Sequence, residues 1–393
     1  MVKISGPADI LGVLPHRLGF HPTESLVVVC LEGPRNRDRL VMRFDLPAEE
    51  CDDALVGLVL ERVRAMKATG ALLVVYTEQS SPISSASPIS GISGTARMGV
   101  VTSSGDVRRG RSVGDRSGSR AAGEPRGLPR EALIDLLTRR LGKKRVEVFE
   151  ALLVHGGLWY SYHCTDGVCC PAEGTPVSRD PTPAAARYAA EAVLLGNSVL
   201  PSRDDVRRTF EPSDHTVAVA AREQGADLAG ERLMTVADAL GMDGARDLVI
   251  ATLLRLLDAW SDGDTAVDQE DASLVAVGLH DKRTRDEVMT FVLDHDGSLL
   301  VAVFSEIARR AVEEDTAPIC TVLAWAAYAD GSGALASLAA ERALECEPGY
   351  AMAELVLDGL SRMVPPDAVR AICRQVRADL EGGGSGAALG SAG

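Results

Sequence analysis

The residues best suited to chemistry are three cysteines and a histidine that lie close together near the middle of the chain. They are His163, Cys164, Cys169 and Cys170. Thiolate sulfur and imidazole nitrogen are ligands that zinc prefers, and zinc takes four ligands in a tetrahedron. The spacing is not a paired Cys-x-x-Cys. Cys164 and Cys169 could converge across the loop, with Cys170 or His163 as a third ligand, and a fourth would have to come from elsewhere, for example His16, His21 or His155. The pattern indicates a zinc site or, in the alternative, a loop whose thiols pack as small apolar groups or form a redox-labile pair.

A second group of polar residues stands directly before the first predicted strand. It comprises two histidines, an arginine, a glutamate and a serine, namely His16, Arg17, His21, Glu24 and Ser25. Histidine titrates near neutral pH and can act as a general base. Ser25 could act as a nucleophile only if a histidine reached it. The alternative is a polar loop that holds the entrance of the strand.

Three aromatic residues precede the cysteines in a protein that is only 4% aromatic. Trp159, Tyr160 and Tyr162 combine large apolar surface with a polar group, so they suit a binding cleft or an interface. The alternative is packing within a hairpin and the core. Loops at strand ends are where α/β proteins place binding groups. We therefore expect the loop His16–Ser25 and the loop Cys164–Cys170 to lie close together and to form the main functional cleft.

Hydrophobic periodicity predicts a mixed α/β domain over residues 1–180. Ser25–Leu31 is apolar on both faces, which predicts a buried central strand. Alternation over 40–46 predicts a second strand antiparallel to it. Further elements are predicted as helices at 55–66 and 130–141 and as strands at 71–76 and 146–154. Gly156-Gly157 between two strand-like runs is a hairpin signal. The predicted fold class is α/β, a mixed sheet with antiparallel pairs.

The rest of the chain has a different pattern. The segment from about 79 to 129 is rich in Ser, Gly and Arg and poor in apolar residues, so burial cannot offset its ordering entropy and we expect a disordered insertion. Between 181 and 380 apolar residues recur at helical spacing, which predicts an all-α helical array. The tail, residues 381–393, is expected to be disordered.

Composition argues against several classes of function. The net charge of -15 over 393 residues repels phosphate backbones and argues against nucleic acid as a partner. No apolar run has the length needed to span a bilayer, and the N-terminus lacks the apolar core of a secretory signal. The cysteines outside the cluster are scattered among apolar or helical stretches, as in a reducing compartment. We therefore expect a cytoplasmic protein that binds a protein partner or a small ligand, without nucleic acid or membrane.

Four motifs give the chain a resemblance to a known family. They are LGVLPHRLGFHPTESLVVV, RFDLP, WYSYHCTDGVCCPAEGTPV and NSVLPSRDDV. On these motifs the chain resembles the actinobacterial domain-of-unknown-function family 4192. The resemblance covers nearly the whole chain except the Ser/Gly/Arg-rich insertion. It implies the domain boundaries and a bacterial cytoplasmic setting, and it implies no substrate because no activity is established for the family.

A second resemblance concerns residues 317–362. Small residues there, including Ala324, Ala327, Ala336 and Ala343, fall where a tetratricopeptide-like helical hairpin places its own. Such residues let two helices approach closely. The large tryptophan and the second aromatic of that motif are missing, so the repeat is degenerate. The alternative is an ordinary antiparallel helix pair.

The sequence leaves two classes of function open and does not decide whether the protein is an enzyme. No Walker A loop and no His-Glu-x-x-His motif occurs in it. The preferred interpretation is a binding or scaffold protein that uses the helical array and the cleft beside the cysteine loop. The alternative is an enzyme or a zinc-dependent module, with a site formed by the loops His16–Ser25 and Cys164–Cys170. Zinc is the cofactor that the cysteines would take.

Overall fold

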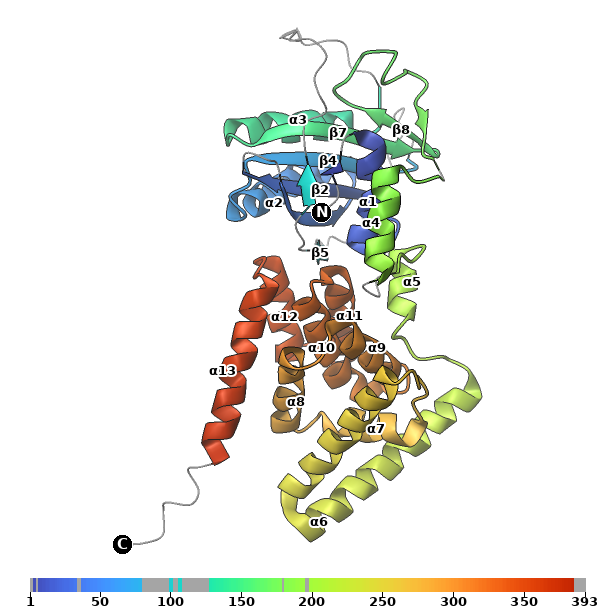
Figure 1. The fold of residues 1–393 in the computed structure, drawn as a ribbon, viewed down its shortest axis with the longest axis vertical. Coiled ribbons are helices and arrows are strands. Elements are labelled where there is room, and N and C mark those ends of the chain that lie inside the picture. The colour runs from blue at the N-terminus through green and yellow to red at the C-terminus, as the bar shows by residue number, and fades with distance from the viewer. Residues whose placement is uncertain are drawn as a thin grey trace, which may run out of the picture. The chain divides into compact units, whose positions relative to one another are not determined.

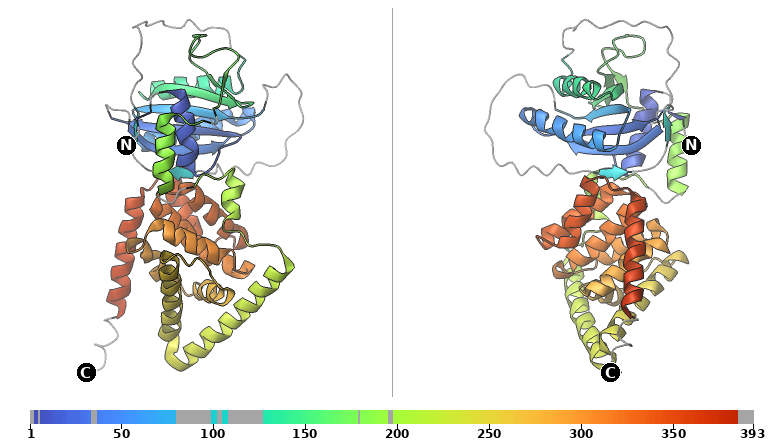
Figure 2. Two further views of the ribbon diagram at one scale, coloured as in Figure 1. Left: turned by 45° about the vertical axis from the view of Figure 1, so that its right-hand side comes forward. Right: turned by 90° about the vertical axis from the view of Figure 1, so that its left-hand side faces the viewer.

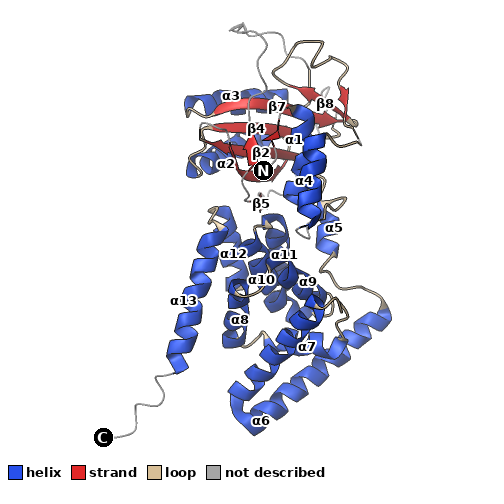
Figure 3. Ribbon diagram, viewed as in Figure 1, coloured by secondary structure: helices blue, strands red, loops and turns tan. Residues whose placement is uncertain are grey.

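A mixed β-sheet and an array of helices form the two units of the chain, residues 1–202 and 203–393 (Figure 1). The computed structural model describes residues 3–4, 6–33, 37–79, 99–101, 105–107, 127–178, 180–194 and 198–384. Within these ranges every strand belongs to the first unit, and the regular elements of the second unit are helices (Figure 3). The predicted fold class, a mixed sheet with antiparallel pairs followed by a helical array, is therefore confirmed.

One sheet contains all the described strands of the first unit. Their order across the sheet is β1-β6-β3-β2-β4-β7-β8-β9, and β5 pairs with β3. The strands are β1 (Lys3–Ile4), β2 (Ser25–Glu32), β3 (Arg37–Asp45), β4 (Gly70–Tyr76), β5 (Gly99–Val101), β6 (Gly105–Val107), β7 (Glu147–His155), β8 (Leu158–Ser161) and β9 (Thr175–Pro176). Strand β2 is antiparallel to both β3 and β4, whereas β4 and β7 are parallel. The crossover between β4 and β7 contains helix α3 (Glu131–Lys143).

Strand β2 lies inside the sheet because both of its faces are apolar. Leu26, Val27 and Val28 have no exposed surface. Full burial of an aliphatic side chain of this size stabilises by about 1.5–3 kcal/mol. A strand buried on both faces is a continuous apolar run rather than an alternating one. The predicted central strand and its antiparallel neighbour, β3, are both confirmed.

The other elements predicted before residue 162 are also present. The helix predicted over 55–66 is α2 (Asp52–Ala65), which follows the short 3-10 helix η1 (Glu49–Cys51), and the helix predicted over 130–141 is α3. Gly156 and Gly157 close the hairpin between β7 and β8 with φ values of 59° and 74°. A type I′ turn requires positive φ at both central residues, and glycine adopts it without a steric penalty.

Helix α1 (Pro7–Leu18) extends into the segment expected to be the loop His16–Ser25. Pro7 stands in the first turn, where its missing N–H costs nothing. Gly19 ends the helix with a φ of 82° and donates its N–H to the carbonyl of Pro15. Pro15 hides the helix in the sequence, because proline inside a helical pattern usually marks its end. The expected loop His16–Ser25 is therefore wrong over its first three residues, which form the last turn of α1.

Helix α4 (Pro183–Leu194) packs along α1. Figure 2 shows these two helices on one face of the sheet and α2 with α3 toward the other. The sequence predicts that residues after 180 belong to the helical array, whereas α4 packs on α1 and lies in the first unit, which ends at Ser202.

The segment expected to be a disordered insertion is described only in part. Strands β5 and β6 lie within it and pair with β3, and β6 also pairs with β1. Residues 80–98, 102–104 and 108–126 lie outside the described residues, as do residues 385–393 of the expected disordered tail.

The second unit consists of helices joined by short connections. They are α5 (Arg203–Arg208), α6 (Thr216–Ser261), α7 (Gln269–Gly278), α8 (Lys282–Met289), η2 (Thr290–Leu293), α9 (Gly297–Ala308), α10 (Glu313–Asp330), α11 (Gly333–Cys346), α12 (Ala351–Ser361) and α13 (Pro366–Gly384). Helix α6 is kinked at Gly241, whose φ of 79° is not helical. Within the described residues, no helix combines the length and the apolar character needed to cross a membrane.

Helix α10 is the core of the second unit. Every residue from Asp315 to Ala329 is buried, and a helix that is apolar nearly all round is typical of a core. Helices α9 and α11 pack against it. Ala324 and Ala327 on α10, with Ala336 and Ala343 on α11, have no exposed surface, which fits the close approach that the sequence predicts. The tetratricopeptide-like character of this pair stays a prediction.

The contact between α1 and α4 gives a first testable prediction. A Cβ atom added at Gly12 would lie 2.6 Å from the Cβ of Ala185, whereas a Cβ at Gly57 in α2 would meet nothing within 4 Å. Overpacking costs about 1–3 kcal/mol, which exceeds the gain of about 1 kcal/mol from replacing a helical glycine. Gly12→Ala should therefore lower the urea midpoint of the first unit, and Gly57→Ala should raise it. A Gly12→Ala protein as stable as Gly57→Ala would contradict this packing.

Candidate functional site

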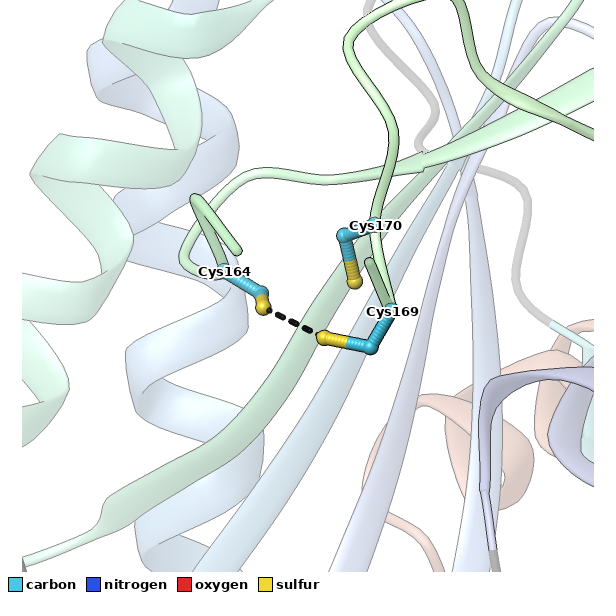
Figure 4. Close-up of side chains that lie close together, drawn as sticks. All are labelled: Cys164, Cys169 and Cys170. Atoms are coloured by element: carbon cyan, nitrogen blue, oxygen red, sulfur yellow. Dashed lines mark hydrogen bonds between the residues drawn. The ribbon is translucent and has the colours of Figure 1, made fainter. Parts of the chain in front are cut away.

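Three cysteine side chains converge in the loop that follows β8. The Sγ atoms of Cys164, Cys169 and Cys170 all lie within 4.8 Å of one another. The Sγ atoms of Cys164 and Cys169 are 3.2 Å apart and point toward each other (Figure 4). Cys170 is buried, Cys164 is half-buried and Cys169 is exposed. The three cysteines of the loop therefore differ in burial, from the buried Cys170 to the exposed Cys169.

Ser161, the last residue of β8, holds the start of the cysteine loop. Its Oγ accepts hydrogen bonds from the backbone N–H of Cys164, at 3.0 Å, and of His163, at 3.3 Å. The same hydroxyl donates to Oε1 of Glu150 on β7, at 2.9 Å. Ser161 is 1% exposed, so water does not compete for these bonds. The direction of the chain at Cys164 is thus set by a buried hydroxyl and a carboxylate of the neighbouring strand.

Asp166 shapes the tip of the loop. Its Oδ1 accepts the backbone N–H of Val168 at 2.9 Å, and its carbonyl accepts the backbone N–H of Cys170 at 2.8 Å. An aspartate that bonds the backbone two residues ahead forms an Asx turn, which tightens the chain. These two bonds fold the loop back, and this brings Cys169 and Cys170 opposite Cys164.

The three thiols differ in how readily they lose a proton. Burial acts to raise the pKa of Cys164, but hydrogen bonds to its sulfur from Cys169 and from the backbone of Asp166 outweigh burial and lower that pKa. The hydrogen bond with Cys164 raises the pKa of Cys169, and burial raises that of Cys170. The cluster thus favours one thiolate, at Cys164. A bound metal ion would favour the deprotonated form of all three, because thiolate is the ligand.

His163, expected as a candidate ligand beside the cysteines, is not part of this cluster. Its Nε2 lies 3.4 Å from Oγ1 of Thr138 on α3. Across the described part of the chain, the only group of three or more candidate metal ligands is the three cysteines. The cluster therefore supplies three sulfur donors, and His163 connects the loop to α3.

The register of the sheet separates the cysteine loop from the N-terminal candidates. A line across β2, β4, β7 and β8 passes through Ser25, Tyr76, Val154 and Trp159. Strands β2 and β8 run in the same direction. His21 comes four residues before this line on its chain, and Cys164 comes five residues after it. The two loops thus lie toward opposite ends of the strands, and the expectation that they form one cleft is wrong.

His16 and Arg17 contact helix α4 rather than the strand entrance. The His16 ring lies 6.3 Å from the ring of Tyr188, and Nη1 of Arg17 donates to the Tyr188 hydroxyl at 3.4 Å. Burial, with a smaller effect of His21, lowers the pKa of His16. Arg17 is 3% exposed. These two residues therefore help to join α1 to α4, and His21 remains exposed.

Glu24 joins a network at the carboxyl ends of β4 and β7. Its Oε2 accepts the hydroxyl of Thr77 at 2.9 Å, and its Oε1 accepts the backbone N–H of Glu78 at 2.7 Å. The ring Nδ1 of His155 lies 2.9 Å from the carbonyl of Thr77. Because a carbonyl can only accept, this bond requires a proton on Nδ1. Glu24 has a φ of 39°, unusual for a residue other than glycine, and the network holds it there.

The side chains of the remaining candidate residues make contacts that support the fold. Ser25 has no exposed surface and donates its hydroxyl to the carbonyl of Thr23, so the geometry gives it no histidine partner. Trp159 is 8% and Tyr162 3% exposed. The Tyr162 hydroxyl donates to the carbonyl of Pro129 at 2.6 Å. Tyr160 is half-buried, and its hydroxyl lies 3.4 Å from the carbonyl of Glu173.

No sequence pattern identifies Thr77, Glu150 or Ser161 as a residue that supports the site. Each is a single polar residue at the end of an apolar strand or within it, with no spacing motif. A polar side chain buried in a strand needs a hydrogen-bond partner. The candidates for that partner are residues on the neighbouring strands. The neighbours themselves become visible only with the register.

The fold and the cluster define a class of protein with a mixed α/β unit, an exposed three-cysteine loop and a helical unit. A family model described as a domain of unknown function (DUF4192) matches residues 7–367, and the chain belongs to this family. Searches of curated proteins and of solved structures find no match.

Glu150 gives a prediction about pH. Burial raises its pKa above 4.5, although hydrogen bonds from Ser161 and from the backbone of Ala151 oppose the shift. The folded state therefore binds this proton more tightly than the unfolded state. The resulting stability is complete below the unfolded pKa and is lost as pH rises through the folded pKa. Glu150→Gln should remove this loss and flatten the pH dependence of the unfolding free energy above about pH 4.

The measurement is urea unfolding over a pH series for the wild type, for Glu150→Gln and for a control, Glu147→Gln. Glu147 lies on the same strand but is exposed. The control should keep the wild-type pH dependence. Superimposable profiles for the wild type and Glu150→Gln would show that Glu150 is not the group responsible.

Proposed function

We propose that the chain is a binding protein whose first unit carries a zinc centre of three thiolates, with one coordination position left for an external ligand. The observation that supports this most directly is the convergence of the Sγ atoms of Cys164, Cys169 and Cys170 within 4.8 Å. The external donor belongs to a small ligand or to a side chain of a protein partner. The helical unit is the second contact surface for such a partner.

The spacing of the sulfur atoms suits a tetrahedral ion. Zinc–sulfur bonds of 2.3 Å at tetrahedral angles place two sulfur atoms about 3.8 Å apart. The Sγ atoms of Cys164 and Cys169 are 3.2 Å apart, and all three Sγ atoms lie within 4.8 Å of one another, so the cluster is compact enough for one ion. Small rotations about the Cα–Cβ bonds would therefore bring the three sulfur atoms onto one ion.

The number of donors points to an open centre. Structural zinc sites have four protein ligands, whereas sites that bind a substrate or water have three. Cys169 is exposed, and the neighbouring Val168 is 94% exposed. The loop thus faces solvent, and a donor from outside the chain can reach the fourth position. Thiolate ligands persist where thiols stay reduced, which agrees with a cytoplasmic setting.

The alternative of an enzyme site shared by two loops has less support. The sheet register sets His21 and Cys164 toward opposite ends of the strands. The hydroxyl of Ser25 is buried against the carbonyl of Thr23. A hydrolytic role would have to rely on water at the zinc alone, and among the residues of known position no acidic or imidazole group joins the three thiols.

The proposal predicts metal binding by the full chain. Reduced protein should take up about one equivalent of zinc, and a chelator should lower its melting temperature. Cobalt in place of zinc should give thiolate-to-metal charge-transfer absorption. Cys164→Ser and Cys169→Ser should each abolish tight binding, and Cys51→Ser, a half-buried cysteine outside the cluster, should leave it unchanged. Metal-free protein whose stability is the same with and without zinc and chelator would refute the zinc centre.

Ser161 should act on the metal only through the position of the loop. Ser161→Ala removes the acceptor for the backbone N–H groups of His163 and Cys164. Loss of such a supporting bond typically weakens metal affinity by about 10–100-fold. Zinc affinity is measured by chelator competition, with Ser178→Ala as a control because that serine is exposed. Equal affinities for the wild type and a folded Ser161→Ala protein would contradict the positioning role.

A further inference from the structure

The contact between two of the sulfur atoms has a consequence that does not involve metal. The Sγ atoms of Cys164 and Cys169 lie 3.2 Å apart and face each other across the loop (Figure 4). A disulfide needs its sulfur atoms about 2.05 Å apart. Closing the remaining distance takes a movement of about one ångström within a loop of six residues.

The exposure of the three thiols ranks them for reaction with a small oxidant. Cys169 is exposed, Cys164 is half-buried and Cys170 is buried. A solute in water therefore reaches Cys169 first. Cys169 and Cys170 are adjacent, and their Cα atoms are about 3.8 Å apart, below the 4.4–6.8 Å usual for a disulfide. Cys164 is thus the partner that the geometry favours for an oxidised Cys169.

We infer that Cys164 and Cys169 form a site of oxidation by hydroperoxides, which closes a disulfide between them. In the first step the thiol of one of the two and hydrogen peroxide give a sulfenic acid and water, as the O–O bond breaks and an S–O bond forms. In the second step the sulfur of the other cysteine attacks the sulfenic sulfur, the S–O bond breaks, and the hydroxyl leaves as water with the proton of the attacking thiol. The sulfurs lose two electrons in all, and peroxide gains them.

The other buried cysteines serve as internal references. Cys30 has no exposed surface, and Cys320 and Cys373 are each 1% exposed. Susceptibility to oxidation follows thiolate character and exposure, and burial raises the pKa of all three thiols, so they should survive conditions that oxidise Cys164 and Cys169. Selective oxidation of the cysteine loop would therefore result from the different burial of the cysteines in this fold, and not from their number.

The disulfide requires no metal, so it can form in the metal-free chain. One consequence rests on the proposed zinc centre. The disulfide removes two of the three sulfur donors, so an oxidised chain should lose its zinc, and bound zinc should slow the oxidation. Oxidation by peroxide would then abolish the zinc centre, and with it the coordination position for an external ligand.

The test uses the reduced, chelator-treated full chain exposed to hydrogen peroxide. Mass spectrometry should show the loss of two hydrogen atoms and a peptide that joins Cys164 to Cys169. Cys169 should lose its thiol roughly tenfold faster than Cys30 or more, because Cys30 is buried. In Cys164→Ser the sulfenic acid at Cys169 should persist and be trapped by a cyclic 1,3-dione. Cys170→Ala and Cys51→Ser should both keep the cross-link.

Two results would overturn the inference. One is the survival of the Cys169 thiol while Cys30 or another buried cysteine reacts, and the other is a cross-link that joins a different pair. A zinc titration of the same preparation separates the two proposals. If the chain forms the cross-link but takes up no zinc, only the proposed function is refuted. If the chain takes up zinc but never forms the cross-link, only the oxidation site is refuted.

Discussion

The antiparallel pairing of β7 with β8 is the constraint on which the candidate site depends. The two glycines at positive φ make the turn as tight as a two-residue hairpin allows. This turn sets Ser161 opposite Leu152, within reach of the Glu150 carboxylate. From there the Ser161 hydroxyl holds the first backbone N–H groups of the cysteine loop. A shift of one residue in this register would turn Ser161 to the other face of the sheet and release the loop.

The same sheet keeps two polar groups apart. At one end, Glu24, Thr77 and His155 join the start of β2 to the ends of β4 and β7. That network satisfies polar groups where three strands meet and supports the backbone of Glu24 at a positive φ. At the other end, the cysteine loop follows β8, with Cys169 exposed and Cys170 buried. The carboxyl edge of the parallel strands is where α/β proteins usually bind ligands, yet here the sulfur donors lie away from it.

Much of the fold could be predicted from the sequence, and the site only in part. Continuous apolar runs and the Gly156-Gly157 pair are local signals, so the strands and the hairpin were correctly predicted. Helix α1 was missed because Pro15 interrupts its pattern. The gathering of Cys164, Cys169 and Cys170 follows from loop chemistry near Asp166 and was also predicted. The shared cleft was wrong because strand order and register are set by non-local pairing, which no residue near His21 or Cys164 encodes.

The proposed zinc centre has three thiolate ligands and one open position. X-ray absorption at the zinc edge of the metal-loaded full chain measures this directly. We expect three sulfur neighbours at about 2.3 Å and one lighter neighbour, oxygen or nitrogen, at about 2.0–2.2 Å. A shell of four sulfur atoms would mean a closed site that includes a further cysteine, and a shell of oxygen and nitrogen alone would mean that the cysteine loop is not the zinc site.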